Sequence, residues 1–112
     1  MAWHEHRVED IPPTVLEALH TALAMEGEPD NWFNDMAWIM AQESSGRVGI
    51  HNPTSTARGL YQLTRVNYHL MPHAASSFGN AIDECRGGIR YVRQRYHTAT
   101  HARQWWEQHH WY

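Results

Sequence analysis

The sequence predicts a small domain built from α-helices alone. Apolar residues recur at intervals of three and four along several stretches of the 112-residue chain, as on a helix with one buried face. No stretch shows a convincing alternation of apolar and polar residues, which would mark a half-buried strand. Proline and glycine flank these stretches, where helices start and stop. The predicted class is therefore all-α.

The first expected helix opens at Pro12 and Pro13, because a proline in the first turn loses no hydrogen bond. Gly27 and Pro29 end it. Its apolar positions share one face: Val15, Leu16, Leu19, Ala22 and Leu23.

The second expected helix is capped by Asn31 or Asn34 and ends at Gly46. Glu43 lies on its last turn. Its apolar face includes Trp38, Ile39 and Met40. Residues 46–58 then form a loop rich in glycine, serine and threonine, and a short helical stretch over 57–71 ends at Pro72.

The longest helical pattern covers residues 80–96, and a last helix contains residues 101–108. Gly87 and Gly88 lie inside the long pattern and cost about 1 kcal/mol each relative to alanine. We expect a neighbour to pack there too closely for a side chain. The periodic apolar positions are Ile82, Cys85, Ile89, Val92 and Tyr96.

Composition indicates one domain over residues 1–112, which buries roughly two-thirds of its unfolded surface. Cys85 has no partner for an internal disulfide, and we expect a buried, inert thiol. A net charge of −3 argues against nucleic-acid or anionic-lipid partners. The charged N-terminus lacks the apolar core of a signal peptide, and no run is long enough to span a membrane. We therefore expect synthesis in the cytoplasm, and a monomer.

Histidines and arginines are numerous, but neither group indicates a ligand. No acidic or cysteine ligand accompanies the histidine pairs at a known metal spacing, so we expect no metal and no cofactor. The arginines are interpreted as a solvated helix face. The residues are His69, His73, His97, His101, His109 and His110, with Arg86, Arg90 and Arg93.

Three motifs in order resemble the lytic transglycosylase domain of the soluble transglycosylase (SLT) type, in the lysozyme-like superfamily. The first is Glu-Ser-Ser at 43–45, followed by Asn-Pro at 52–53, and the second is Ala-Arg-Gly-Leu-Tyr-Gln-Leu at 57–63. The third resembles the family's Gly-x-x-Tyr helix and places Tyr91 at the motif tyrosine. The ending over 102–112 is similar to those of phage-borne members. The resemblance covers roughly residues 32–112.

This resemblance implies a lysozyme-like helical domain with a substrate cleft. Two residues depart from the family pattern: Tyr61 replaces the usual methionine, and Thr56 replaces a glycine. We expect Tyr61 to adjust a sugar subsite. The family's active-site serine has no secure counterpart, and Ser55 or Asn52 is the candidate for its role.

The expected chemistry centres on Glu43. Glycoside cleavage usually takes two carboxylates, but Asp35, Asp83 and Glu84 have no comparable motif around them. A substrate-assisted route needs only one carboxylate. The acetamido oxygen of an N-acetyl sugar attacks the anomeric carbon while Glu43 protonates the leaving oxygen. Burial beside Trp38 and Met40, at the negative end of a helix dipole, would raise the pKa of that acid.

Three residues are expected to support this acid. The resemblance makes Gln62 a sugar hydrogen-bonding group in the cleft. Gly59 would let the backbone approach the sugar or Glu43 closely. The Tyr91 hydroxyl is a candidate hydrogen-bond donor toward Glu43.

The resulting hypothesis is a peptidoglycan lytic transglycosylase that cuts the β-1,4 bond between N-acetylmuramic acid and N-acetylglucosamine. Glu43 acts as acid and then as base, leaving a 1,6-anhydro product. The phage-like ending indicates a phage or prophage protein, carried in the virion or released at lysis. A hydrolytic muramidase and a catalytically inactive peptidoglycan-binding or virion module remain the alternatives.

Overall fold

A computed structural model describes residues 5–112, and that part of the chain holds four α-helices joined by turns and short 3-10 helices. The α-helices are α1 (Pro13–Met25), α2 (Phe33–Ser44), α3 (Ala81–Tyr96) and α4 (Ala99–His109). The 3-10 helices are η1 (Val8–Asp10), η2 (Asp30–Trp32), η3 (Arg65–Leu70) and η4 (Ala74–Ser77). Residues 5–112 contain isolated β-bridges but no strand, so the predicted all-α class is confirmed.

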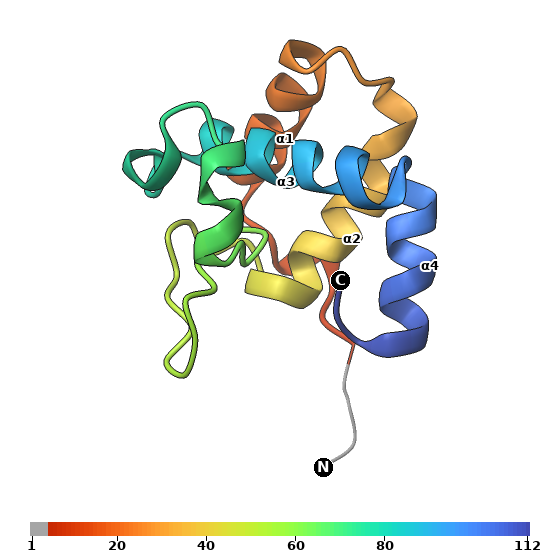
Figure 1. Ribbon diagram of the computed structural model, residues 1–112. Helices are drawn as coiled ribbons and strands as arrows, with labels where there is room; N and C mark the ends of the chain where they lie inside the picture. The colour runs from red at the N-terminus through yellow and green to blue at the C-terminus, as the bar shows by residue number, and fades with distance from the viewer. Residues whose placement is uncertain (1–4) are drawn as a thin grey trace.

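Helix α3 runs through the middle of the molecule and packs along α1, while α4 packs against α2 (Figure 1). The side chains between these helices form one buried cluster. Its fully buried aliphatic members include Leu19, Leu23, Met36, Ile39, Met40, Ile89 and Val92. The C-terminal residues return toward α2, between α4 and the loop that follows α2 (Figure 1).

Helix boundaries follow the predicted signals at most places. Helix α1 has a proline at its first position, and Asn80 caps α3 by accepting a hydrogen bond from the Asp83 amide at 3.0 Å. The predicted asparagine cap of α2 is wrong. That helix continues directly from η2 and has Trp32 as its N-cap, without a side-chain hydrogen bond.

The predicted helix over 57–71 is only partly right, because its first half is a tight turn. Arg58 and Leu63 exchange backbone hydrogen bonds of 3.0 and 3.1 Å, and only Arg65–Leu70 is helical, as a 3-10 helix. Gly59 and Gln62 both have positive φ, at 84° and 51°. The turn buries Leu60 and Leu63 by folding the chain back, which apolar spacing alone does not distinguish from a helix.

The two glycines of α3 permit the close packing that the sequence predicted. A Cβ on Gly87 would lie 2.4 Å from the Met71 side chain, and one on Gly88 would lie 2.3 Å from the Tyr61 ring. Cys85, on the same face, is fully buried, and its burial raises the pKa of the thiol far above the ordinary value. The predicted inert cysteine is confirmed.

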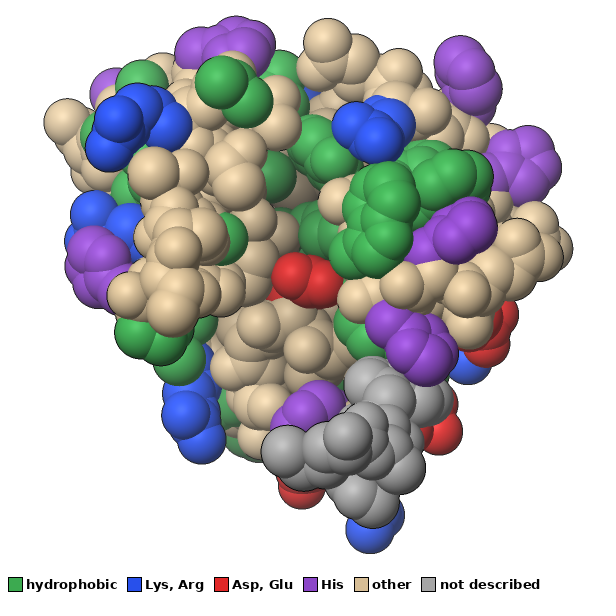
Figure 2. Space-filling view, turned by 60° about the horizontal axis from the view of Figure 1, so that its bottom comes forward, with side chains coloured by type: hydrophobic (Ala, Val, Ile, Leu, Met, Phe, Trp, Pro, Cys, Tyr) green, Lys and Arg blue, Asp and Glu red, His purple; other side chains and the backbone are tan. Residues whose placement is uncertain are grey.

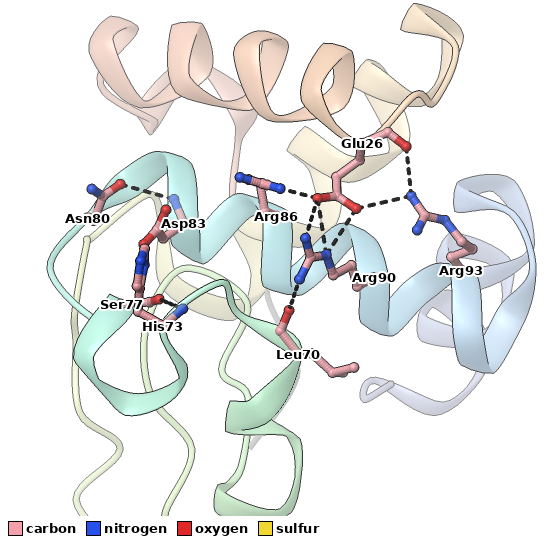
Figure 3. A network of polar contacts seen from close by, with 9 residues as sticks. All are labelled: Glu26, Leu70, His73, Ser77, Asn80, Asp83, Arg86, Arg90 and Arg93. Carbon is pink, nitrogen blue, oxygen red and sulfur yellow. Dashed lines mark hydrogen bonds and ion pairs between the residues drawn. The ribbon is translucent and has the colours of Figure 1, made fainter.

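The arginines of α3 are not a freely solvated face, and this expectation was wrong. Glu26, whose side chain is 5% exposed, accepts hydrogen bonds from Arg86 at 2.8 Å and from Arg90 at 3.0 Å (Figure 3). Arg93 binds Glu26 at 3.3 Å and Glu28 at 2.8 Å. Burial tends to raise the pKa of Glu26, but the hydrogen bonds from Arg90 and Arg86 outweigh it and lower that pKa. These contacts fasten the end of α1 to α3.

Residues 5–112 contain neither a membrane-spanning helix nor a cluster of metal-ligating side chains. No helix in this part of the chain has both the length and the apolar character needed to cross a membrane. Nor do three or more histidine, cysteine or acidic side chains of this part gather as a metal site would require.

Candidate active site

Glu43 lies on the last turn of α2, where the sequence placed it. The helix ends one residue later, at Ser44, because Ser45 adopts the left-handed conformation with a φ of 54°. The Ser45 amide still bonds to the Ala41 carbonyl at 3.1 Å, which closes the last turn. Residues 36–41 before Glu43 are all buried, so its carboxyl group stands at the edge of the core.

The carboxyl group of Glu43 receives a hydrogen bond from the indole of Trp106 on α4. Trp106 Nε1 donates to Glu43 Oε2 at 2.7 Å, and the Trp106 ring meets Trp38 edge-on at 5.4 Å between centroids. Glu43 Oε1 accepts no hydrogen bond from residues 5–112, which leaves this oxygen for a ligand. Trp106, rather than Tyr91, is thus the donor, and the predicted Tyr91 hydrogen bond is wrong.

Burial makes Glu43 an unusually weak acid. Loss of solvent contact raises its pKa from 4.5 to about 7, and the Trp106 hydrogen bond opposes this rise only in part. Near neutral pH the group is therefore divided between its protonated and ionised forms. Such a carboxyl group can give a proton and take one back, as acid–base catalysis requires.

Three tyrosines stand close enough to Glu43 for its charge to raise their pKa values, together with burial. Tyr112 is central among them: its ring meets Tyr91 edge-on at 5.0 Å and stacks on Tyr96 at 6.3 Å. Its hydroxyl donates to the Tyr61 carbonyl oxygen at 2.6 Å. Tyr91, Tyr96 and Tyr112 thus form an aromatic cluster within electrostatic reach of Glu43.

A pocket of about 260 Å³ lies beside this cluster and brings three predicted site residues together: Tyr61, Gln62 and Tyr91. The Gln62 amide nitrogen donates to the carbonyls of Gly59 at 3.0 Å and Ile50 at 3.2 Å, so its amide oxygen faces no donor within residues 5–112. The other walls are formed by Leu63, Thr64, Val66, Asn67, Arg95 and Tyr112. We call this the Gln62 pocket.

Figure 2 shows the face that lies at the bottom of Figure 1. The surface is hollowed near its centre, and an acidic side chain is visible in the hollow, with hydrophobic side chains beside it. Arginine side chains are visible on the left, and histidines lie around the rim of this face, several of them on the right. The face therefore combines the chemical groups that an amphipathic ligand would meet.

The other predicted binding residues are placed less favourably. Tyr61 belongs to the core: its side chain is 1% exposed and its hydroxyl donates to the Met36 carbonyl at 2.9 Å. Tyr61 nevertheless lines the Gln62 pocket, so the expectation that it adjusts a sugar subsite stays a prediction. Asn52 and Ser55 stabilise their own loop by accepting from the amides of Thr54 and Ala57. Neither lines a described pocket.

The alternative carboxylates are all engaged elsewhere. Asp35 accepts from Thr100 at 3.0 Å and from Arg103 at 3.3 Å. Asp83 lies 3.3 Å from a ring nitrogen of His73. Among residues 5–112, no contact joins either group to Glu43.

Glu84 is a buried structural residue that sequence reasoning did not recognise. Its carboxylate accepts hydrogen bonds from the amides of Leu60 at 2.7 Å, Gly79 at 2.7 Å and Gly49 at 3.2 Å. A Cβ on Gly59 would lie 2.7 Å from Glu84 Oε1, so the close approach at this glycine is to Glu84. The expected approach of Gly59 to Glu43 is therefore wrong. Glu84 fixes the loop after α2 onto α3.

We expect the variant Trp106→Phe to raise the pKa of Glu43 further, because it removes the hydrogen bond that stabilises the ionised form. A titration of the Glu43 carboxyl carbon by NMR should show a midpoint above about 7. The variant Trp32→Phe, in the core before α2, is the control and should leave the midpoint in place. An unchanged midpoint in Trp106→Phe would contradict the role of the indole.

Comparison with protein-family models, with curated proteins and with solved structures found no match to this chain. What it does must therefore be inferred from its own residues and their geometry.

Proposed function

We propose that the protein is a peptidoglycan lytic transglycosylase that uses Glu43 as its single acid and base. The observation that carries this proposal is a partly buried carboxyl group with a pKa of about 7, whose charge acts on Tyr91 and Tyr112 in the wall of the Gln62 pocket. Sugars suit such a pocket, because aromatic rings cover their apolar faces and amides pair with their hydroxyls.

The proposed reaction begins with protonated Glu43. It gives its proton to the glycosidic oxygen between N-acetylmuramic acid and N-acetylglucosamine, and the bond from this oxygen to the anomeric carbon breaks. The acetamido oxygen of the muramic acid attacks that carbon, so the positive charge passes to a cyclic oxazolinium. No second protein carboxylate takes part in this step.

The second step returns the proton to Glu43. Its carboxylate takes the proton from the 6-hydroxyl of the same sugar, and the hydroxyl oxygen attacks the anomeric carbon to close a 1,6-anhydro ring. The bond from that carbon to the oxazolinium oxygen breaks, which restores the neutral acetamido group. Attack within one molecule is favoured because the groups are already held together. Asp35 and Asp83 are engaged elsewhere and make no contact with Glu43 among residues 5–112, which agrees with a route that needs no second carboxylate.

The products of sacculus digestion test the proposal. Muropeptides released from purified sacculi should carry 1,6-anhydro ends, which are lighter than reducing ends by the mass of one water. Mass spectrometry of the soluble fraction distinguishes the two. Ordinary reducing muramic acid as the main product would contradict the transglycosylase and identify a muramidase.

The resemblance to phage-borne domains supports a further part of the proposal. The protein would act on the bacterial cell wall as a lysis protein or as a component of the virion. Its partner would be the glycan strand, bound without metal or cofactor.

A further inference from the structure

Residues 5–12 lie along the second half of α2, the helix that carries Glu43. The 3-10 helix η1 within this stretch packs against α2 (Figure 1). In the turn after α2, Gly46 approaches Ile11 so closely that an added Cβ would lie 2.8 Å from the Ile11 side chain. This stretch, which we call the N-terminal segment, therefore follows α2 past Glu43 to the end of the helix.

The Gln42 side chain, one residue before Glu43, binds the N-terminal segment by a pair of hydrogen bonds. Its amide oxygen accepts from the His6 amide at 2.9 Å, and its amide nitrogen donates to the His6 carbonyl at 2.8 Å. The same nitrogen donates to the Trp38 carbonyl, one turn earlier on α2, at 3.2 Å. Gln42 thus fixes the backbone of residue 6 against the turn of α2 that carries Trp38.

Glu5, the neighbour of His6, fixes the Trp38 ring. Trp38 Nε1 donates to Glu5 Oε1 at 2.5 Å, and Trp38 is only 6% exposed. The guanidinium of Arg103, on α4, stands 4.6 Å from the centroid of the Trp38 ring. A ring that is bound both at its nitrogen and over its face has little freedom to turn.

Trp38 borders the indole that reaches Glu43. Trp106 meets Trp38 edge-on, at 5.4 Å between centroids, and donates to Glu43 Oε2 at 2.7 Å. Aromatic pairs have preferred geometries, so a turn of the Trp38 ring also displaces Trp106. Contacts therefore run from Glu5 through two tryptophans to Glu43.

We propose that Glu5 and Gln42 are positioning residues for Glu43. They hold Trp38 in place, and Trp38 in turn holds the Trp106 indole in the orientation that donates to the carboxyl group. Neither Glu5 nor Gln42 lines a pocket described in residues 5–112, so both act through Trp38. The inference rests on the proposed function only for the role of Glu43 as the acid.

Other charged and titratable groups face these contacts, and a test must leave them unaltered. Arg103 is paired with Asp35 at 3.3 Å and with Glu107 at 3.6 Å. The His110 ring stands 5.6 Å from the Trp106 ring. The remaining groups are His6 on the N-terminal segment and the tyrosines within electrostatic reach of Glu43, which are Tyr91, Tyr96 and Tyr112.

An NMR titration of the Glu43 carboxyl carbon tests the inference without any substrate. Glu5→Ala should raise the midpoint by about half a pH unit, because a loosened indole hydrogen bond stabilises the ionised form less. Gln42→Met removes the pair of hydrogen bonds without changing a charge and should act in the same direction. Glu5→Gln keeps an acceptor oxygen for the Trp38 indole and should leave the midpoint nearly in place.

A double-mutant cycle separates this positioning role from a general loss of stability. In a Trp106→Phe background no indole hydrogen bond remains to be loosened, so Glu5→Ala should not raise the midpoint further. Glu9→Ala removes an exposed glutamate of the same segment and should leave the midpoint unchanged in both backgrounds. An unchanged or lowered midpoint in Glu5→Ala, or an equal rise in both backgrounds, would overturn the inference.

Cleavage of solubilised glycan strands distinguishes this inference from the proposed function. Protonated Glu43 starts the proposed reaction, so the alkaline limb of kcat/KM in Glu5→Ala should move to higher pH by as much as the NMR midpoint. An alkaline limb that stays in place in an active Glu5→Ala variant would overturn the positioning role while the transglycosylase stands. If the unaltered protein cleaves no strand, the proposed function fails, and the NMR cycle still decides how Glu5 acts on Glu43.

Discussion

The variant Glu43→Gln is expected to lose sacculus clearing by at least ~10²-fold, because an amide cannot give or take the proton that both steps require. The amide oxygen of glutamine can still accept the Trp106 hydrogen bond, so the geometry of the site should persist. Turbidity of a sacculus suspension measures the loss. Glu17→Gln, an exposed change on α1, is the control and should clear sacculi normally. Full activity in Glu43→Gln would exclude Glu43 as the acid.

The same substitution should stabilise the protein at alkaline pH. The folded state holds the Glu43 proton more tightly than the unfolded chain, because burial raises the pKa from 4.5 to about 7. Stability from the protonated group is therefore complete below pH 4.5 and is lost as the pH rises through about 7. At ~1.4 kcal/mol per pH unit the loss is at most about 3 kcal/mol. Glutamine does not ionise, so the Glu43→Gln variant avoids this loss of stability.

Thermal unfolding at two pH values tests whether the substitution stabilises the protein at alkaline pH. Near pH 8 the midpoint of Glu43→Gln should lie above that of the unaltered protein, and near pH 4 the two should agree. A higher midpoint for the unaltered protein at alkaline pH would mean that the Glu43 carboxylate is well solvated or paired in the folded state.

The variant Glu84→Ala is expected to lower the free energy of unfolding by more than about 3 kcal/mol. It leaves the buried amide of Leu60 and the partly buried amides of Gly49 and Gly79 without an acceptor, and a buried group of this kind costs roughly 1–3 kcal/mol. A small domain has only about 5–15 kcal/mol in total, so this variant should be close to unfolding. Urea denaturation followed by circular dichroism gives the value.

A graded series separates the hydrogen bonds from the loss of volume. Glu84→Gln keeps one acceptor oxygen but places an amide N–H₂ near one of the three donors, so its stability should fall between those of Glu84→Ala and the unaltered protein. Glu17→Ala on the exposed face of α1 should change stability by no more than about 0.5 kcal/mol. Equal stability of Glu84→Ala and Glu17→Ala would show that the amides find water instead.

The sequence predicted the features that depend on neighbours in the chain. Helices α1, α3 and α4 follow from apolar periodicity, and the close contacts at Gly87 and Gly88 follow from the cost of glycine in a helix. The position of Glu43 at the end of α2 followed from the serines and glycine after it. Each of these signals lies within a few residues of the feature that it predicts.

The features that the sequence did not predict depend on residues far apart in the chain. Trp106 and Glu43 are 63 positions apart, and Arg90 and Glu26 are 64 apart, so neither pair leaves a local pattern. The turn before η3 was mistaken for a helix because Leu60 and Leu63 have helical spacing in either conformation. Acidic residues in the first turn of a helix are common, so Glu84 resembled an ordinary one.

The contact between Gly88 and the Tyr61 ring couples two positions that are far apart in the sequence. A larger residue at 88 is accommodated only if residue 61 becomes smaller, so tolerated changes at these positions should occur in pairs. A smaller residue at 61 would also lose the hydroxyl bond to Met36 and free the backbone whose carbonyl holds Tyr112. Repacking beneath α3 would thus disturb the tyrosine cluster near Glu43. A change in the volume of the core should therefore also change the pKa of Glu43.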